Sequence, residues 1–394
     1  MRVLYLSYND ATSALAESQV LPYLVGLAAR GHDITLLSWQ HGSEPNATFR
    51  EMELSERLAQ AGIRWRTLRY HARPAVASTL FDIARGIAYA RALHLQQQFD
   101  LVHARSYVPA AVALGFKRVT GIPYIFDMRG MMAEEYVEGG NWSSDSLPYQ
   151  LTKSMEGSLL SEAAATVVLT RNIGRHLVEQ ARVRASTLSV IPCCVDLHRF
   201  QPATTRRSAA DPLRLVYAGS VGTWYLLDEM VQFASLGLPL HEVRLLILNA
   251  DERSRIRAAL DRSPALRGRA SSIGIPPKAV PGYLAGSDVG LSFRKSTFSQ
   301  RASSPIKVAE YLASGLPVVS TPGVGDLDEQ LATERVGVTV SGTDPSALQE
   351  VWPRLTDLTM DPTVAERARA AAERHYSLNE GVTRYDEIYR GLGQ

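Results

Sequence analysis

Residues 303–319 read SSPIKVAEYLASGLPVV, a short helix that leads into a buried strand. Ser304 and Pro305 are typical of a helix start, because a serine hydroxyl caps free N–H groups and proline lacks the N–H that a first turn leaves unpaired. Gly315 and Pro317 then favour an end to the helix before the apolar pair of valines. The stretch therefore predicts one unit of a parallel sheet covered by helices.

The same alternation of short apolar runs and helical patterns continues along both halves of the chain. It predicts an α/β fold with two Rossmann-like, doubly wound domains that face one another across a cleft. We expect strands at residues 2–8, 34–39, 101–104, 123–127, 166–170 and 188–192, then at 214–218, 244–249, 288–293, 317–321 and 336–340.

The length of 394 residues also predicts two domains, since one core rarely grows so large. The segment 199–212 is polar and flanked by proline, which is typical of a linker. We expect a first domain at 1–198, this linker, a second domain at 213–376 and a terminal helix at 377–394 that packs near the domain junction. Ligands should bind at the carboxyl ends of the strands, between the domains.

Composition excludes several classes of function. The chain has 42 Lys and Arg against 40 Asp and Glu, so no nucleic-acid footprint is expected. Its two cysteines, Cys193 and Cys194, are adjacent and suit a reducing compartment. The start of the chain has no signal-peptide pattern and no apolar run is long enough to span a bilayer, so we expect a cytoplasmic protein. We expect no metal site, because no His and Cys cluster is apparent.

The segment Arg64–Arg73 is locally basic and aromatic, with no acidic residue between Glu56 and Asp82. An edge strand that carries solvated arginines is the simpler interpretation. The alternative is peripheral contact with anionic lipid headgroups at the inner face of the membrane, or contact with a phosphate-bearing acceptor.

Lys307 and Glu310 are the two charges in the opening stretch, and two interpretations stay open. At a spacing of three residues they fit a weak surface ion pair. Alternatively, the N–H groups of the helix start and Lys307 bind a diphosphate, while Glu310 accepts hydrogen bonds from a sugar diol. Glu310 shares a stripe with apolar and small side chains, which favours the second interpretation.

A glycine-containing loop follows the first strand of the second half. Gly219 and Gly222 allow a ligand to approach the backbone, and Ser220 and Thr223 add hydroxyl groups. A simple tight turn is the alternative.

Charged residues also follow two strands of the first half. Asp127 and Arg129 come at the end of the run YIFDMRG, where a doubly wound domain does its chemistry, although a structural ion pair is the alternative. His103 and Arg105 stand at the end of another strand. They either border the cleft, or His103 is a core histidine.

Several of these stretches resemble glycosyltransferase family 4, the retaining sugar transferases of GT-B fold. Residues 303–319 look like its donor-site segment. Further landmarks appear in the expected order at Leu27–His32, Phe99–Ala104, Val190–Phe200, Ala218–Ser220 and Tyr283–Val289. The resemblance spans nearly the full chain.

The resemblance implies a nucleoside-diphosphate sugar held by the second domain, an acceptor held by the first, and no metal. It assigns the donor ribose to Glu310, the second glutamate of the family's paired pattern, whereas the first is replaced by Ala302. The usual basic pair of the glycine loop is also missing. Lys307, Arg294 and Lys295 are then the cations available to the diphosphate, together with Ser304 at the helix start. Lys307 is preferred.

The resulting hypothesis is transfer of a sugar to a hydroxyl of a glycan or glycolipid, with retention of configuration. Lys307 would stabilise the leaving diphosphate, Asp127 would orient the acceptor hydroxyl, and Arg129 would hold Asp127 or contact phosphate. A nucleotide-sugar epimerase of the same architecture and a sugar-nucleotide-binding protein that has lost catalysis are the alternatives.

Overall fold

The computed structural model describes residues 1–41, 47–204, 208, 211–249 and 251–393. The chain forms two compact units, one of Met1–Pro192 with Leu378–Gln394 and one of Cys193–Ser377. The second unit thus begins at Cys193 rather than after the segment 199–212, because Val195 pairs with Ser377 and Phe200 packs into the second unit's core. Residues 205–207 and 209–210 of the expected linker lie outside the described residues.

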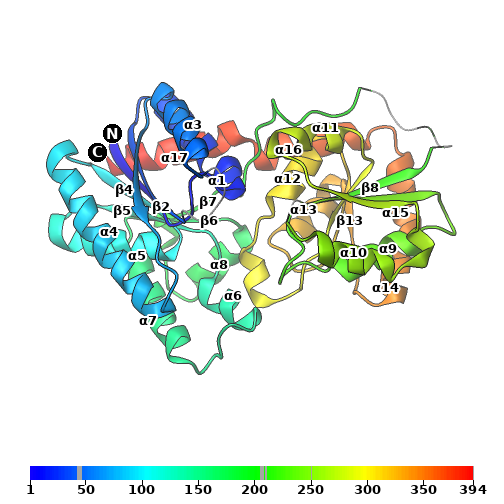
Figure 1. The fold of residues 1–394 in the computed structure, drawn as a ribbon, viewed down its shortest axis with the longest axis horizontal. Coiled ribbons are helices and arrows are strands. Elements are labelled where there is room, and N and C mark those ends of the chain that lie inside the picture. Colours follow the sequence, from blue (N-terminus) through cyan, green and yellow to red (C-terminus); the bar gives the residue numbers. More distant parts are fainter. Residues whose placement is uncertain (42–46, 205–207, 209–210, 250, 394) are drawn as a thin grey trace. The chain divides into compact units, whose positions relative to one another are not determined.

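The first unit contains a parallel sheet, part of which is labelled in Figure 1. Among the described residues its strand order is β3-β2-β1-β4-β5-β6-β7. The strands are β1 Arg2–Ser7, β2 Asp33–Gln40, β3 Arg64–Arg69, β4 Leu101–Arg105, β5 Tyr124–Met128, β6 Ala165–Val168 and β7 Leu188–Val190. The helices are α1 Ala14–Gln19, α2 Leu21–Ala29, α3 Ala47–Gln60, α4 Ala75–Gln97, α5 Tyr107–Thr120, α6 Met132–Glu138, α7 Leu147–Glu162, α8 Arg171–Glu179 and α17 Leu378–Leu392.

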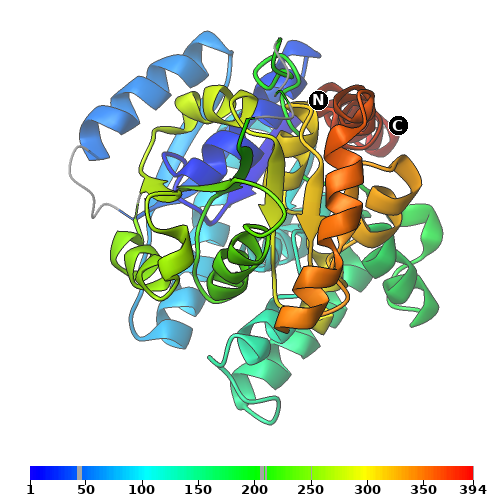
Figure 2. The ribbon, with the colours of Figure 1, turned by 90° about the vertical axis from the view of Figure 1, so that its right-hand side faces the viewer.

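The second unit contains another parallel sheet, with the order β10-β9-β8-β11-β12-β13, and helices on both of its sides (Figure 2). The strands are β8 Leu213–Ala218, β9 Val243–Leu248, β10 Ala270–Ile273, β11 Val289–Ser292, β12 Val318–Ser320 and β13 Gly337–Thr339. The helices are α9 Leu227–Leu236, α10 Arg253–Asp261, α11 Val280–Ala285, α12 Ile306–Ala313, α13 Leu327–Glu334, α14 Pro345–Glu350, α15 Trp352–Met360 and α16 Val364–Tyr376.

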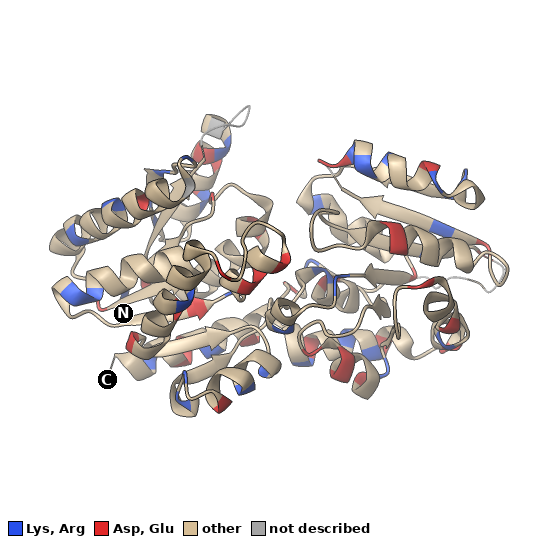
Figure 3. Cartoon of the chain, turned by 90° about the horizontal axis from the view of Figure 1, so that it is seen from below, with Lys and Arg blue, Asp and Glu red and all other residues tan. Residues whose placement is uncertain are grey.

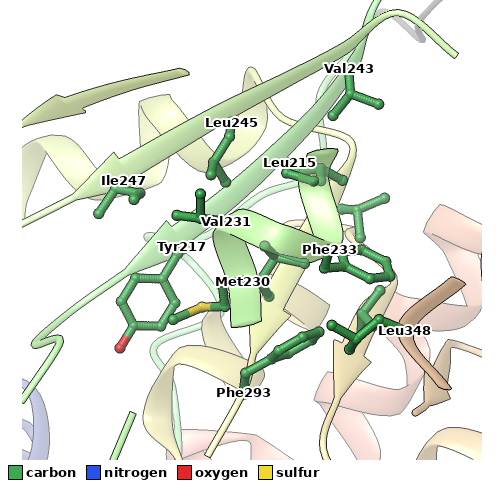
Figure 4. Packing of buried hydrophobic residues seen from close by; sticks show 14 of the residues in the cluster. Leu215, Tyr217, Met230, Val231, Phe233, Val243, Leu245, Ile247, Phe293 and Leu348 are labelled. Carbon is green, nitrogen blue, oxygen red and sulfur yellow. The ribbon is translucent and has the colours of Figure 1, made fainter. Parts of the chain in front are cut away.

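Apolar side chains cover both faces of the second sheet. One cluster joins β8 and β9 to α9 and includes Phe233, which stacks on Trp352 with ring centroids 4.7 Å apart. The other joins the sheet to α12 and α16. Tyr217 lies at the edge of the first cluster, with its hydroxyl directed away from the apolar side chains (Figure 4). A sheet buried on both faces explains why its strands read as continuous apolar runs.

The expected α/β class and the two parallel sheets are confirmed. Strand β10 was not predicted, because its sequence ASSI has no apolar run and it forms an edge of the sheet. Strand β3 is the edge of the first sheet, as the basic segment indicates. Lysine and arginine are interspersed with aspartate and glutamate over both units, in line with the near-balance of charge (Figure 3).

The terminal helix α17 belongs to the first unit and packs on α2. A Cβ atom at Gly26 would lie 2.7 Å from Cγ2 of Val382, so the two helices meet where α2 has no side chain. Tyr385 and Tyr389 are buried on the inner face of α17. The apolar stripe of this helix therefore packs into the core of the first unit, and it places the hydroxyl of Tyr389 against His103 on β4.

Tyr311 links α12 to the loop that follows β8, and this contact gives a stability prediction. Its hydroxyl accepts a hydrogen bond of 2.8 Å from the buried N–H of Ala218. Tyr311→Phe leaves that N–H unpaired, so we expect the free energy of unfolding to fall by about 1–3 kcal/mol. Urea unfolding measures it, with Tyr283→Phe as an exposed control. Equal midpoints for Tyr311→Phe and wild type would contradict the prediction.

Candidate functional site

Lys307 is the central cation of the second unit. It is only 5% exposed, and its Nζ donates a hydrogen bond of 2.7 Å to the hydroxyl of Tyr217. The ammonium also lies 4.0 Å from the ring centroids of Tyr217 and Tyr225. Within the described residues no carboxylate forms an ion pair with it. The surface-pair interpretation of Lys307 and Glu310 is therefore wrong.

The charge of Lys307 is held in an unfavourable environment. Burial lowers the pKa of Lys307 well below its usual value, and the nearby charge of Arg294 lowers it further, whereas Glu310 acts in the opposite direction. Aromatic faces attract a cation but do not neutralise it. A buried ammonium without a carboxylate partner gains most from an anionic ligand.

Arg294 also lies against Tyr225, just after the carboxyl end of β11. Its Nε donates to Gln300 at 2.6 Å, and its guanidinium carbon lies 4.9 Å from the Tyr225 ring centroid. Lys307 and Arg294 thus share one aromatic ring. Lys295, the third expected cation, is exposed, and its backbone N–H donates to the carbonyl of Trp224 at 3.0 Å. The structure brings two of the three cations together.

The glycine loop approaches Lys307 directly. Gly219 has a φ of 128°, and a Cβ atom there would lie 3.1 Å from Nζ of Lys307, so glycine is required. The hydroxyl of Tyr217 donates to the carbonyl of Ser220 while it accepts from Lys307. Gly222 donates its N–H to the Ser220 hydroxyl at 3.2 Å, and Thr223 is exposed. The loop is more than a turn, because it encloses the ammonium group.

Glu252 is a member of this site that the sequence interpretation missed. Its Oε2 accepts hydrogen bonds from the N–H of Val221 at 2.7 Å and from the hydroxyl of Ser220 at 3.0 Å. Burial raises the pKa of Glu252, but these bonds and one from Asn249 outweigh it, so the pKa is lowered. Asn249 directly follows β9. Polar residues at the carboxyl end of this strand were the feature of the sequence that could have indicated Glu252 as a site residue.

Glu310 lies three residues after Lys307 on α12, and no ion pair joins these two residues, both of which the structure describes. Its side chain is half-buried, and it makes no hydrogen bond with another described residue. Burial raises the pKa of Glu310 to about 7, although the charges of Lys307 and Arg199 lower it. The carboxylate is thus poised to accept hydrogen bonds that the chain itself does not supply.

Ser304 does not cap the helix, contrary to expectation. Pro305 occupies the cap position of α12, and the Ser304 hydroxyl instead accepts a hydrogen bond of 3.1 Å from the N–H of Cys193. The backbone of Pro305 is extended, so the helix begins one residue later than predicted. The first turn of α12 therefore has no side-chain cap.

The polar cluster of the first unit lies at the carboxyl ends of β4 and β5, where Arg105 pairs in register with Asp127. Asp127 is 2% exposed and lies 3.4 Å from both Arg129 and His103. Burial raises its pKa, but Arg129, the hydrogen bond from His103 and the charge of Arg105 outweigh it and lower the pKa of Asp127 to about 2. The structural ion pair between Asp127 and Arg129, which was the alternative interpretation of these two residues, is therefore present in the structure.

His103 is a core residue. Its Nδ1 lies 2.7 Å from the hydroxyl of Tyr389 on α17, and its Nε2 lies 3.4 Å from Asp127. Burial lowers the pKa of His103, although Asp127 raises it. Because the imidazole is only 1% exposed, His103 does not border a cleft; it contacts the carboxylate of Asp127 from within the core.

Gln19, at the end of α1, is the second residue that the sequence interpretation missed. Its Oε1 accepts hydrogen bonds from Arg105 at 3.2 Å and from Arg129 at 3.3 Å. It thereby holds both guanidinium groups beside Asp127. In the sequence, only its position as a polar residue at the end of the first helix after β1 could have indicated this role.

Both parallel sheets carry polar clusters at the carboxyl ends of their strands, where doubly wound domains bind their ligands. The family model described as a glycosyl transferase 4-like domain matches residues 16–194. D-inositol 3-phosphate glycosyltransferase of Salinispora arenicola is 25% identical over 338 residues, which cover 77% of this chain and 71% of that protein.

Solved structures show the same fold over the full length. Sucrose-phosphate synthase from Thermosynechococcus elongatus superposes with a TM-score of 0.76 at 17% identity, covering 100% of this chain and 99% of its own. Anabaena HepE in complex with UDP and glucose gives 0.70 at 15% identity, covering 99% of each chain. The matched domain, the relative and the solved structures together support a GT4-type glycosyltransferase with the GT-B fold, a transferase of class EC 2.4. The epimerase alternative is not favoured.

Among the described residues, no group of three His, Cys, Asp or Glu side chains is placed to hold a metal ion. Across the same ranges, none of the helices combines the length and apolarity needed to cross a bilayer.

Proposed function

We propose that the protein transfers a sugar from a nucleoside diphosphate to a hydroxyl of a glycan or glycolipid, with retention of configuration and without a metal. The observation that carries this proposal is the buried ammonium of Lys307, which lies beside the glycine loop and has no carboxylate partner among the described residues. In the absence of a metal ion, this group supplies positive charge where the leaving diphosphate gains negative charge. The UDP complex of the similar Anabaena structure supports a nucleotide donor.

The donor is assigned to groups that surround Lys307. Its diphosphate contacts Lys307 and Arg294, and its ribose diol donates hydrogen bonds to the carboxylate of Glu310. Ser220 and Val221 already donate to Glu252, so the diphosphate lies on the Lys307 side of the loop. The exposed Lys295 is left with a minor electrostatic role.

Asp127 is assigned to the acceptor. Its pKa of about 2 makes it a weak base, so it accepts a hydrogen bond from the acceptor hydroxyl and orients it rather than removing the proton. The acceptor oxygen forms the new bond to the anomeric carbon as the bond to the diphosphate oxygen breaks. The acceptor proton passes to that leaving oxygen, which retains the configuration by attack from the same side.

Calorimetric titration of UDP-, GDP- and dTDP-sugars, followed by product analysis with a broad acceptor panel, tests the proposal. We expect one nucleotide class to bind, and Asp127→Asn to bind it equally while turnover falls by about 10²-fold. If no nucleotide sugar binds, the proposal is wrong. Binding without turnover on any acceptor would favour the alternative of a protein that has lost catalysis.

We also propose peripheral contact with anionic lipid beside strand β3. Arg66 and Arg69 are exposed on this edge strand, whereas Arg64 is engaged by Asp33. Leu80 and Phe81, which are 61% and 52% exposed, lie in the first turns of α4 that follow. Basic side chains beside exposed apolar ones suit an anionic bilayer surface.

Vesicle co-flotation gives the corresponding prediction. Each arginine near an anionic surface contributes about 1 kcal/mol, so the double charge reversal Arg66→Glu, Arg69→Glu should weaken binding to phosphatidylglycerol-containing vesicles by roughly tenfold or more. The matched double variant Arg253→Glu, Arg267→Glu on the second unit should bind like wild type. Equal binding of wild type to neutral and anionic vesicles would contradict the proposal.

A further inference from the structure

Two tyrosines lie in contact beyond the carboxyl ends of β1 and β3 in the first unit, and a third lies within electrostatic range of one of them. Tyr8 follows β1, Tyr70 follows β3, and Tyr136 lies in α6; we call them the tyrosine cluster. The rings of Tyr8 and Tyr70 are 5.3 Å apart at 67°. Burial raises the pKa of Tyr136, and the phenol of Tyr70 raises it further, so the two hydroxyl groups lie within electrostatic range of each other.

A fully buried carboxylate holds one side of the cluster in place. Asp82 has 0% exposure and accepts hydrogen bonds from the hydroxyl of Tyr8 at 2.8 Å, from Nδ1 of His71 at 2.6 Å and from the N–H of His71 at 3.1 Å. Burial of a carboxylate is costly unless it is paired and hydrogen-bonded. None of the groups assigned to the transfer reaction uses Asp82, so this arrangement needs another explanation.

The remaining phenols are open to a ligand. The hydroxyls of Tyr70 and Tyr136 make no hydrogen bond with another described residue, and Tyr136 is 42% exposed. Each ring is also fixed by a second aromatic ring. Tyr70 stacks on His41 with centroids 4.1 Å apart, and Tyr136 lies 4.3 Å from Trp142. The cluster thus presents rigid aromatic faces with free hydroxyl groups.

The cluster is continuous with the groups assigned to the acceptor. Asn9, the residue after Tyr8, accepts a hydrogen bond of 3.4 Å from Arg105. Arg105 pairs in register with Asp127. A molecule whose hydroxyl is oriented by Asp127 therefore has the tyrosine cluster beside it, along the same edge of the sheet.

We propose that the tyrosine cluster binds a carbohydrate ring of the acceptor, next to the residue that receives the sugar. This inference rests on the proposed transferase function and names the acceptor as a saccharide at this position. A pyranose has an apolar C–H face that packs on an aromatic ring, and its hydroxyls pair with phenols. An anionic group does not suit the cluster, because the carboxylates of Asp82 and Glu135 lie beside it. An acyl chain would leave the phenols unpaired.

Saturation-transfer-difference NMR with maltose, cellobiose, lactose and chitobiose tests this inference. In the intact protein, we expect ring C–H signals from at least one disaccharide. Tyr136→Ala should weaken its apparent affinity by roughly tenfold, since it removes the aromatic face on which the apolar side of the sugar ring packs. Tyr70→Phe, which removes only the hydroxyl, should have a smaller effect. Tyr283→Ala, an exposed tyrosine of the second unit, is the control and should bind like wild type.

Donor binding and donor hydrolysis in the same variants separate this inference from the proposed function. We expect both to equal wild type in Tyr136→Ala. If the donor binds but no disaccharide gives a signal, or if Tyr136→Ala and Tyr70→Phe leave the signal unchanged, the saccharide assignment is wrong while the transferase proposal stands. If the donor does not bind, the proposed function fails first.

Discussion

Lys307→Ala is expected to lower kcat by about 10²–10³-fold, because loss of one preorganised group that stabilises developing negative charge costs about 3–4 kcal/mol in the transition state. The group is already buried, and its Nζ is fixed by Tyr217 at 2.7 Å. Little reorganisation is therefore needed when the diphosphate leaves. Steady-state turnover with a saturating donor measures the effect, with Lys295→Ala as the control that changes an exposed cation by less than about threefold.

The stability of a Lys307 variant distinguishes this role from a structural one. Burial lowers the pKa of Lys307, so below its usual pKa the folded state carries a charge that it holds less favourably than the unfolded chain does. Lys307→Met fills a similar volume without the charge. We expect its free energy of unfolding at pH 7 to equal or exceed that of wild type while turnover is lost. A normal rate would instead assign the diphosphate to Arg294 or Lys295.

Most of the fold was predictable because buried parallel strands leave a clear apolar signal. Strand β12, for example, follows directly from the sequence Val318–Val319 after Gly315 and Pro317. Strand β10 left no such signal, since an edge strand need not be apolar. The identity of each charged residue was visible as well. The degree to which each charged residue is buried was not predictable, since helical spacing alone did not show that Lys307 lies against two tyrosines.

The candidate site was predicted in part for the same reason. Asp127 and Arg105 follow strands that are neighbours in the sheet, so their proximity follows from topology. The partners that arrive from distant segments were not predictable. Glu252 reaches the glycine loop from the end of β9, and Tyr389 reaches His103 from α17, 286 residues along the chain. Such contacts depend on how elements pack and not on any local pattern.

Glu310 gives the second large effect, a donor affinity that depends on pH. Burial raises the pKa of Glu310 to about 7 in the free protein, and only the carboxylate accepts two hydrogen bonds from a ribose diol. Donor binding below this pKa must release a proton, so the dissociation constant should rise by about tenfold for each pH unit below 7 and level off above it. At pH 5 the donor should bind about 100-fold more weakly than at pH 8. Lys307 contributes the opposite trend, because its lowered pKa makes it lose the positive charge more readily as the pH rises.

Calorimetry with an intact nucleotide sugar measures this dependence, because its diphosphate is esterified at both ends and does not titrate near pH 7. Glu310→Ala should weaken binding by about 100-fold or more at pH 8, since each hydrogen bond to a charged group contributes about 1.5–3 kcal/mol. Glu310→Gln keeps the size of the side chain but cannot ionise, so its affinity should be independent of pH between 5 and 8. A dTDP-sugar, which lacks the 2′-hydroxyl, should lose less affinity on Glu310→Ala than the corresponding UDP-sugar does. Equal losses for the two donors, or a pH dependence that persists in Glu310→Gln, would place the ribose away from Glu310.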